Sequence, residues 1–269
     1  MAKYPLKNKI VVLSGASGGI GACIAGLLVN KYGARVIGIG RNEQKLALVK
    51  QKLGDDFSYE AFDVSVRENW RDFEQKLEQN GVIPDLVINN AGVFPRFSKA
   101  SDIDSDEFKK VMDVNFYASV YSTEELMPLL KKSKNPGVYF VCSSAALCPV
   151  AGTAPYTAAK NALKGYAECM SLENNGKLYV GIAYPGVTMS DLFRGDERVE
   201  KSGVDKIAAS PMKTAKKICR AVYLKKRKKV TGFDAHGMNF LARIFPETGD
   251  KLVARIMKIS KAEVFSDLF

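Results

Sequence analysis

The chain has 269 residues, 46% hydrophobic and 26% charged, which suits one large α/β domain with a full core, so we expect residues 1–269 to form a single domain. The only histidine, His236, argues against metal clusters and Ser-His-Asp hydrolysis. The formal net charge of +11 is compatible with nucleic acid, an anionic membrane surface or an anionic cofactor as partner.

Cysteine usage and hydropathy indicate the compartment. The cysteines are Cys23, Cys142, Cys148, Cys169 and Cys219. They are scattered and include no C-x-x-C pair, which predicts free thiols in a reducing compartment and neither a disulfide framework nor a zinc site. The N-terminal stretch lacks an apolar signal-peptide segment, and no run of about 18 apolar residues follows. We therefore expect a cytoplasmic protein without a membrane-spanning helix.

The first motif is a glycine-rich turn. The β-branched run from Ile10 to Leu13 is typical of a buried strand, and the apolar periodicity after Gly19 predicts a helix packed on the sheet. Gly15, Gly19 and Gly21 mark the turn with the spacing G-x-x-x-G-x-G. Glycines permit a tight turn and close approach of a phosphate to bare N–H groups at a helix N-terminus. The pattern predicts a dinucleotide site, with a purely structural turn as the alternative.

The end of the second predicted strand, Arg35 to Ile39, indicates which dinucleotide is bound. In a dinucleotide fold a carboxylate here would accept hydrogen bonds from the 2′-hydroxyl of NAD. This chain has Gly40 and Arg41 instead. A guanidinium pairs with a 2′-phosphate, so the sequence predicts NADP rather than NAD. An exposed arginine at a strand end is the alternative.

Two further turns follow predicted strands. Asp63 ends the third strand, where it could hydrogen-bond an adenine amino group, and Asn90, Ala91 and Gly92 form a turn after the buried strand from Leu86 to Ile88. Such residues more often fix loops than touch ligands. Their position favours a ligand role here, because ligands of open parallel sheets lie beyond the carboxyl ends of the strands.

The middle of the chain contains a long helical stretch, Ser105 to Lys131, and a strand, Val138 to Cys142. Asn115 lies within the helical stretch, and Ser143 and Ser144 follow the strand. Taken alone, Asn115 is an ordinary mid-helix asparagine. A functional role for these positions follows only from the motifs around them.

Tyr156 and Lys160 lie four residues apart at the predicted start of a helix. This spacing is one helical turn, so both side chains share a face and could share a ligand. A phenol has an ordinary pKa of about 10, and a nearby ammonium lowers it by favouring the phenolate. The pair is therefore a candidate general acid/base with its tuning charge, and a solvated helix face is the alternative.

Seven short motifs occur in one order across residues 8–192: SGASGGIG, FDVS, NNAG, VMDVNF, CSSAA, PYTAAK and YPGVTMS. Their order and spacing resemble the short-chain dehydrogenase/reductase family. This resemblance implies a Rossmann-like, doubly wound parallel sheet with helices on both faces, which agrees with the alternation of strand-like and helix-like stretches. It implies an oxidoreductase that uses NADP(H) to interconvert a ketone and a secondary alcohol. The implied cofactor contacts are Gly15, Ser17, Gly19, Ile20, Gly21, Arg41, Asp63, Val64, Asn90, Gly92, Tyr156, Lys160, Pro185, Gly186 and Thr188.

The resemblance also implies four catalytic positions. Ser143 and Tyr156 hydrogen-bond the substrate carbonyl, and Tyr156 delivers the proton to the developing alkoxide. Lys160 binds the nicotinamide ribose and lowers the pKa of the tyrosine, and Asn115 holds a water that refills the proton. The distance along the chain from Tyr156 selects Ser143; Ser144, one residue nearer, remains the alternative.

After residue 188 come a candidate substrate lid and a C-terminal part that departs from the commonest family pattern. Residues 189–210 are polar and weakly periodic, as expected of a substrate lid. Residues 233–269 form an extension with two amphipathic segments, Met238 to Phe245 and Lys251 to Ile259. This ending loosely resembles that of microsomal hydroxysteroid dehydrogenases and ketosphinganine reductases, which implies a lipophilic substrate such as a steroid or keto lipid. The apolar faces could contact a membrane, complete a hydrophobic pocket or form a dimer contact.

A basic run, Lys225 to Lys229, follows a predicted helix from Pro211 to Leu224. Such a run complements the helix dipole and is usually solvated. With the amphipathic extension it could attract an anionic membrane surface, which would make the protein peripheral to a membrane. Interleaved aromatics and known binding modules are missing from the sequence, so nucleic acid is not an expected partner.

Three classes of function share these motifs. The first is an NADPH-dependent ketone reductase, with a small carbonyl or alcohol molecule as substrate. The second is a non-catalytic NADP-binding sensor or scaffold, which would typically have lost Tyr156 or Lys160. The third is a sugar-nucleotide epimerase or dehydratase, which usually has the spacing G-x-x-G-x-x-G and a longer C-terminal part. The sequence favours the first, and the family resemblance implies a homo-oligomer, dimer or tetramer.

Overall fold

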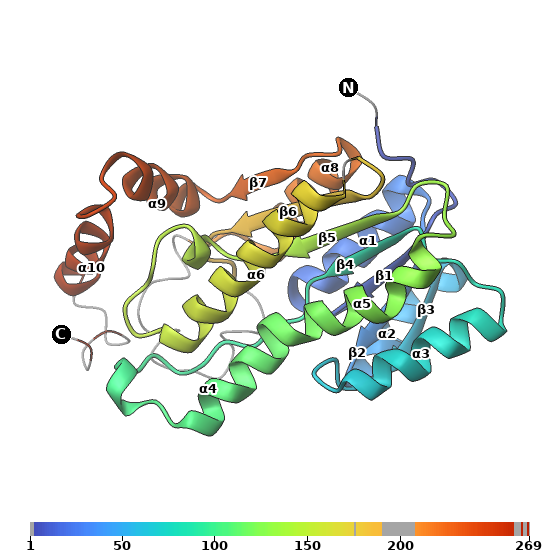
Figure 1. Ribbon diagram of the computed structural model, residues 1–269, viewed down its shortest axis with the longest axis horizontal. Helices are drawn as coiled ribbons and strands as arrows, with labels where there is room; N and C mark the ends of the chain where they lie inside the picture. Colours follow the sequence, from blue (N-terminus) through green and yellow to red (C-terminus); the bar gives the residue numbers. More distant parts are fainter. Residues whose placement is uncertain (1–2, 175, 190–207, 261–264, 266–267, 269) are drawn as a thin grey trace.

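The centre of the molecule is a seven-stranded parallel sheet with the strand order β3-β2-β1-β4-β5-β6-β7 (Figure 1). The computed structural model of the chain describes residues 3–174, 176–189, 208–260, 265 and 268. The strands are β1 (Ile10–Ser14), β2 (Arg35–Gly40), β3 (Phe57–Ala61), β4 (Leu86–Asn89), β5 (Gly137–Val141), β6 (Tyr179–Pro185) and β7 (Lys228–Thr231). This sheet and the helices on its two faces confirm the predicted doubly wound fold.

Helices cover both faces of the sheet (Figure 1). One layer contains α1 (Gly19–Tyr32), α2 (Glu43–Leu53) and α8 (Pro211–Tyr223), and the other contains α3 (Arg67–Gln79), α4 (Ser105–Met112), α5 (Ala118–Leu130) and α6 (Ala154–Glu173). Residues of β1 point alternately to the two layers: Val11 and Leu13 pack with α1 and α8, whereas Val12 packs with α3, α5 and α6. Burial on both faces explains why this strand is continuously apolar.

The point where the strand order reverses determines where the ligand crevice lies. β1 and β4 are neighbours, with β2 and β3 beyond β1 and the later strands beyond β4. Loops that leave two such strands diverge to opposite faces, which opens a crevice beyond their carboxyl ends. The glycine turn follows β1 and the Asn90 turn follows β4, so both predicted ligand segments border this crevice.

The long helical stretch predicted over 105–131 is interrupted. A π-helical segment, Asp113–Tyr117, separates α4 from α5 and contains Asn115. A π segment inserts one extra residue per turn and is often found at functional sites. The interruption occurs where the sequence predicted a functional asparagine.

The C-terminal extension forms α9 (Phe233–Ile244) and α10 (Gly249–Ile259), which lie past the carboxyl end of β7 (Figure 1). The first of these helices begins five residues before the predicted segment. The basic run does not simply follow α8, because its last two residues, Lys228 and Lys229, begin β7 at the edge of the sheet. Among the described residues, no helix is long and apolar enough to cross a membrane.

Candidate active site

A cavity of about 1000 Å³ opens at the carboxyl ends of the strands. Its walls come from the turns after β1, β2, β4, β5 and β6, from the first turns of α6, and from α9 and α10. Of the residues predicted to form the site, those that line the cavity are Gly15, Ser17, Gly19, Ile20, Gly21, Arg41, Asn90, Gly92, Asn115, Ser143, Tyr156, Lys160, Pro185, Gly186 and Thr188.

The glycine turn has no room for a side chain at Gly15 or at Gly21. Gly15 has a left-handed φ of 68°, and a Cβ there would lie 2.9 Å from the Cα of Ala91. A Cβ on Gly21 would overlap the carbonyl oxygen of Gly15. The Asn90 amide braces the turn from β4 by donating from Nδ2 to the carbonyl oxygens of Ser14, at 3.1 Å, and Gly15, at 3.3 Å. Asn90 thus fixes the loop on which the backbone can approach a phosphate.

The end of β2 has basic side chains beside the cavity. Arg41 and Lys45 both line it, and Asn42 between them caps α2 by accepting a hydrogen bond from the N–H of Lys45 at 2.8 Å. Gly40 leaves space for Ser17, whose Oγ would lie 3.3 Å from a Cβ at that position. Lys45 was missed in the sequence, although its place one turn after Arg41 is visible there.

Asp63 and Val64 are not among the described residues that line the cavity. One Asp63 carboxylate oxygen accepts hydrogen bonds from Ser65, from Oγ at 2.7 Å and from N–H at 2.9 Å, while the other lies 3.8 Å from the Arg41 guanidinium. Partial burial raises the pKa of Asp63, but these hydrogen bonds and the charges of Arg41 and Lys110 together hold it below its usual value. In this arrangement Asp63 fixes its loop and faces Arg41; its contact with a cofactor stays a prediction.

Tyr156 and Lys160 project from the first turns of α6. Pro155 lies in the first helical turn, where its missing N–H needs no partner. The Lys160 ammonium nitrogen, Nζ, is buried, 5.5 Å from the centroid of the Tyr156 ring and 3.5 Å from the carbonyl oxygen of Val141. The two side chains therefore share one buried corner of the cavity, as the helical spacing predicted.

The pKa of Tyr156 differs from the sequence-based expectation. Burial raises it to about 12; a hydrogen bond with the Ser143 side chain lowers it, and the neighbouring Cys142 thiol raises it. Burial also lowers the pKa of Lys160. We predicted that Lys160 would bring the pKa of the phenol down, but here desolvation of the phenolate dominates. Tyr156 is therefore a protonated phenol at neutral pH, the form that donates a proton.

Both candidate serines line the cavity, but they differ in their contacts. Ser143 is the one whose side chain hydrogen-bonds Tyr156. Its Oγ also accepts a hydrogen bond from the N–H of Ala145 at 3.2 Å, which holds the turn after β5. The interaction with Tyr156 distinguishes Ser143 from Ser144, and the catalytic role of Ser143 stays a prediction.

Asn115 is buried in the π segment behind Lys160. Its Nδ2 donates to the carbonyl oxygens of Val93, at 2.8 Å, and Val111, at 3.0 Å, and its Oδ1 accepts from the N–H of Val93 at 3.3 Å. A Cβ on Gly92 would lie 2.8 Å from this Oδ1 and 3.7 Å from the Lys160 Nζ. Gly92 therefore leaves a gap through which Asn115 and Lys160 approach each other.

The loop after β6 is held by a residue that sequence reasoning missed. Asp234, in the first turn of α9, lines the cavity and accepts a hydrogen bond from the N–H of Val187 at 2.6 Å. A Cβ on Gly186 would overlap the Asp234 carboxylate. Thr188 donates to the carbonyl oxygen of Gly186 at 3.1 Å. Nothing local in the sequence connects Asp234 to this loop, because the partners are 47 residues apart.

The other end of the cavity is apolar. Phe94 packs edge-on against Tyr156 with ring centroids 4.9 Å apart, and Phe97 lies 5.2 Å from Phe94. From the C-terminal helices the apolar lining residues are Met238, Leu241, Val253, Ile256 and Met257. One of the three alternatives for the extension, completion of a hydrophobic pocket, therefore has a structural basis. The predicted lid over 189–210 falls mostly on 190–207, outside the described residues.

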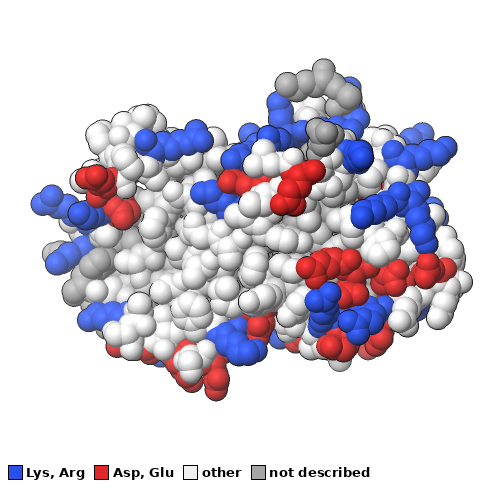
Figure 2. Space-filling model, viewed as in Figure 1, with Lys and Arg blue, Asp and Glu red and all other residues white. Residues whose placement is uncertain are grey.

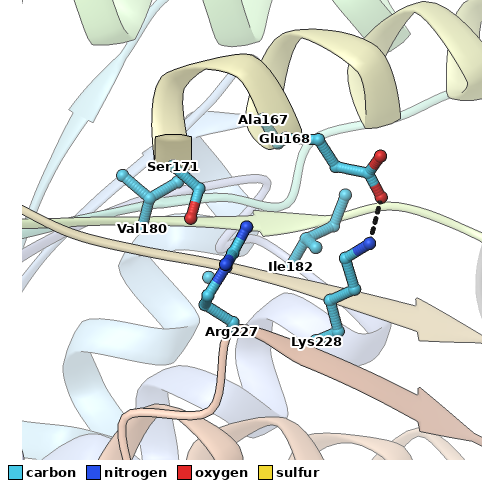
Figure 3. A pocket seen from close by; sticks show the side chains of 8 residues that line it. Ala167, Glu168, Ser171, Val180, Ile182, Arg227 and Lys228 are labelled. Atoms are coloured by element: carbon cyan, nitrogen blue, oxygen red, sulfur yellow. Dashed lines mark ion pairs between the residues drawn. The ribbon is translucent and has the colours of Figure 1, made fainter. Parts of the chain in front are cut away.

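A second, much smaller cavity lies between α6 and the strands β6 and β7 (Figure 3). Its volume of about 10 Å³ has room for one water molecule. Glu168 and Lys228 form an ion pair of 2.7 Å beside it. This crevice is too small for a substrate, which leaves the large cavity as the candidate active site among the described residues.

Comparison with known proteins identifies the family. The model of the family described as short chain dehydrogenase matches residues 9–201. A 3-dehydrosphinganine reductase from Danio rerio is 31% identical over 205 residues, which cover 72% of this chain and 61% of that protein. An 11-beta-hydroxysteroid dehydrogenase from Pinus massoniana is 31% identical over 204 residues, covering 74% of this chain and 56% of the relative. The chain thus spans about three fifths of the length of these relatives.

Solved structures agree on the fold. Serine dehydrogenase, in its closed form complexed with NADP+, superposes with a TM-score of 0.77 at 23% identity, covering 82% of this chain and 94% of that one. The ligand-free aldohexose dehydrogenase of Thermoplasma acidophilum gives 0.75 at 18% identity, covering 87% and 96%. At these identities the likeness concerns the fold alone. The family model and the relatives at 31% identity go further: the chain belongs to the short-chain dehydrogenase family.

Proposed function

We propose that the protein is an NADP(H)-dependent oxidoreductase that interconverts a ketone and a secondary alcohol. The observation that carries this proposal is the convergence of Ser143, Tyr156 and Lys160 at one corner of the large cavity. Reduction of a carbonyl can use these three groups: a protonated phenol, a hydroxyl that is hydrogen-bonded to it, and a buried amine.

The cavity fits a dinucleotide at its glycine-rich end. The cradle formed by Gly15 and Gly21 would be filled by any Cβ, so its backbone can approach a pyrophosphate. Arg41 and Lys45 would hold the 2′-phosphate of NADP, and Gly40 stands where a ribose-binding carboxylate would select NAD. The complex of serine dehydrogenase with NADP+ is compatible with this choice.

The chain's own residues would act on the substrate oxygen. Bound NADPH supplies the hydride. Ser143 donates a hydrogen bond to the carbonyl oxygen, and Tyr156 donates its phenolic proton to that oxygen as negative charge develops there. Lys160 and Asn115, adjacent across Gly92, would orient the ribose and refill the proton. In the reverse direction Tyr156 accepts the proton of a secondary alcohol.

A lipophilic substrate fits the other end of the cavity. Phe94 and Phe97 line one wall, and the inward faces of α9 and α10 line another with apolar side chains. Relatives named for 3-dehydrosphinganine and for an 11-beta-hydroxysteroid point in the same direction. We therefore propose a steroid or keto lipid as the substrate class.

Two expectations about surroundings accompany this function. The five cysteines are free, which supports the reducing, cytoplasmic compartment predicted from the sequence. Figure 2 shows a broad area with few charged side chains over α6 and the start of α5, which suits contact with a second copy in a dimer or tetramer.

The test is oxidation of NADPH by the purified protein against ketones running from small polar ones through ketosteroids to long-chain keto lipids, with NADH as the cofactor control. We expect turnover with NADPH on the bulky apolar ketones. Tyr156→Phe removes only the acidic hydroxyl and should abolish turnover while NADPH still binds; Tyr166→Phe, on the same helix, is the matched control. Binding of NADPH without turnover of any ketone would favour the non-catalytic sensor instead.

A further inference from the structure

The outward face of α9 is an exposed apolar stripe. Phe233, Phe240 and Ile244 are exposed to 97%, 60% and 56%. Their separations of seven and four residues correspond to two turns and one turn, so the three side chains line one face of the helix. Large exposed apolar patches mark surfaces that contact a partner or a membrane.

The neighbouring helix α10 repeats this pattern and adds charge. Leu252, Ile256 and Ile259 are exposed along one stripe. A parallel stripe beside it carries the cations Lys251, Arg255 and Lys258, also spaced by one turn. Figure 2 shows Lys and Arg side chains, with Asp and Glu side chains near them, at the end of the molecule where α10 lies. An apolar stripe flanked by cations is typical of helices that lie in the interface of a bilayer.

Other side chains of these two helices line the cavity. Met238 and Leu241 of α9 and Val253 and Met257 of α10 are lining residues. Ile256 belongs to both surfaces, since it lines the cavity and is 57% exposed. The apolar end of the cavity therefore reaches the surface beside the apolar stripe of α10.

The basic run from Lys225 to Lys229 lies elsewhere. It precedes and begins β7, whereas α9 follows the carboxyl end of that strand (Figure 1). Lys228 is paired with Glu168 at 2.7 Å, and Lys225 lies over the Tyr4 ring, 5.7 Å from its centroid. The run therefore lies at the other end of β7 from the amphipathic helices, and the docking proposal below does not depend on it.

We propose that the outward faces of α9 and α10 dock on a bilayer that contains anionic lipid. Lys251, Arg255 and Lys258 complement phosphate and carboxylate headgroups, and the apolar stripes enter the boundary of the acyl chains. A second copy is a poorer partner, because a two-fold contact through this face would bring the same cations against each other. The docking does not require the proposed reaction. If that proposed function holds, a lipid ketone would reach the cavity beside Ile256 directly from the bilayer.

Vesicle co-sedimentation of the full chain tests this proposal. The probes are vesicles of phosphatidylcholine alone and vesicles that also contain phosphatidylserine. We expect binding to the second kind, weakened on the order of tenfold or more by Lys251→Glu/Arg255→Glu. Phe233→Ser/Phe240→Ser, which removes the apolar stripe of α9 without touching cavity-lining residues, should weaken it comparably.

Matched controls distinguish binding through α9 and α10 from a general attraction between the basic protein and anionic vesicles. Lys225→Glu/Arg227→Glu makes the same change of charge in the basic run. Leu172→Ser removes an apolar residue that is 70% exposed near the C-terminal end of α6. Both should leave binding unchanged, with folding of every variant checked by thermal unfolding. Equal losses from the two charge reversals, or no binding by the wild-type chain, would overturn the proposal. So would a dimer that dissociates on Phe233→Ser/Phe240→Ser. None of these readouts depends on enzyme activity, so failure here is distinct from failure of the proposed reaction.

Discussion

The carboxylate of Asp234 accepts a hydrogen bond of 2.6 Å from the backbone N–H of Val187, and this bond ties the first turn of α9 to the loop after β6. That loop borders the same cavity as Tyr156. The N–H of Gly186 also donates a hydrogen bond to the carbonyl oxygen of Thr231 in β7 at 2.7 Å. The Asp234 side chain therefore connects α9 to a loop that borders the catalytic corner.

Asp234 should act as a positioning residue for the cofactor loop. Asp234→Ala removes a hydrogen bond that contributes about 1.5–3 kcal/mol in comparable settings, so we expect the KM for NADPH to rise about tenfold. Asp234→Asn keeps one amide oxygen as an acceptor, so the KM for NADPH should rise less than in Asp234→Ala. Steady-state kinetics with varied NADPH provides the measurement, and the pH profile of turnover should not change. Asp250→Ala, an acid in the first turn of α10, is the control; an equal effect there would contradict a specific role.

Gly186 and Asp234 should be energetically coupled. A Cβ at Gly186 overlaps the Asp234 carboxylate, so Gly186→Ala alone should impair NADPH binding about as much as Asp234→Ala. In the Asp234→Ala background the added methyl group meets no carboxylate and should cost little, giving a coupling free energy on the order of 1–3 kcal/mol. Gly165→Ala, where a Cβ meets nothing within 4 Å, controls for the general effect of the substitution. Additive effects would show that the two residues act independently.

The two serines should differ in their contribution to turnover. Ser143→Ala removes a donor beside Tyr156 and should lower kcat/KM on the order of 100-fold, the loss typical of one oxyanion-stabilising donor. Ser144→Ala should change kcat/KM by less than about threefold, because its hydroxyl lacks this contact. Thermal unfolding of both variants separates this effect from loss of the Ser143 bond to Ala145. The reverse order of effects would assign the role to Ser144.

Local patterns were enough to predict the parts of the site that local geometry fixes. The glycine turn follows from three glycines between a strand and a helix, and Tyr156 and Lys160 share a corner because four residues make one helical turn. The family resemblance supplied the remaining positions. None of these inferences needed knowledge of which distant segments meet.

Most of the features that the sequence did not reveal depend on contacts between distant segments. Asp234 reaches Val187 across 47 residues, and the raised pKa of Tyr156 follows from burial by several segments. The π segment around Asn115 adds one residue to a turn, which apolar periodicity cannot resolve. The basic run is separated from the amphipathic helices because β7 lies between them.

Arg41 should decide the choice between NADPH and NADH. Arg41→Ala should weaken the binding of NADPH but not that of NADH. Arg41→Asp should shift the ratio of kcat/KM for the two cofactors towards NADH on the order of 100-fold. The alanine variant is needed because an aspartate here would also face Asp63, whose carboxylate lies 3.8 Å from the Arg41 guanidinium. Arg35→Asp, at the opposite end of β2, is the matched control. Unchanged preference in both variants would show that Arg41 does not contact the 2′-phosphate.

The raised pKa of Tyr156 predicts opposite pH dependences for the two directions. Reduction needs the protonated phenol, and because burial raises the pKa to about 12, this form persists through neutral and mildly alkaline pH. We therefore expect kcat for reduction to be flat between about pH 6 and pH 9. Oxidation needs the phenolate, so its kcat should rise up to about tenfold per pH unit and still be rising at about pH 10. Measuring kcat in both directions across this range tests the assignment. A plateau of the oxidation rate at neutral pH would show that Lys160 tunes the phenol after all.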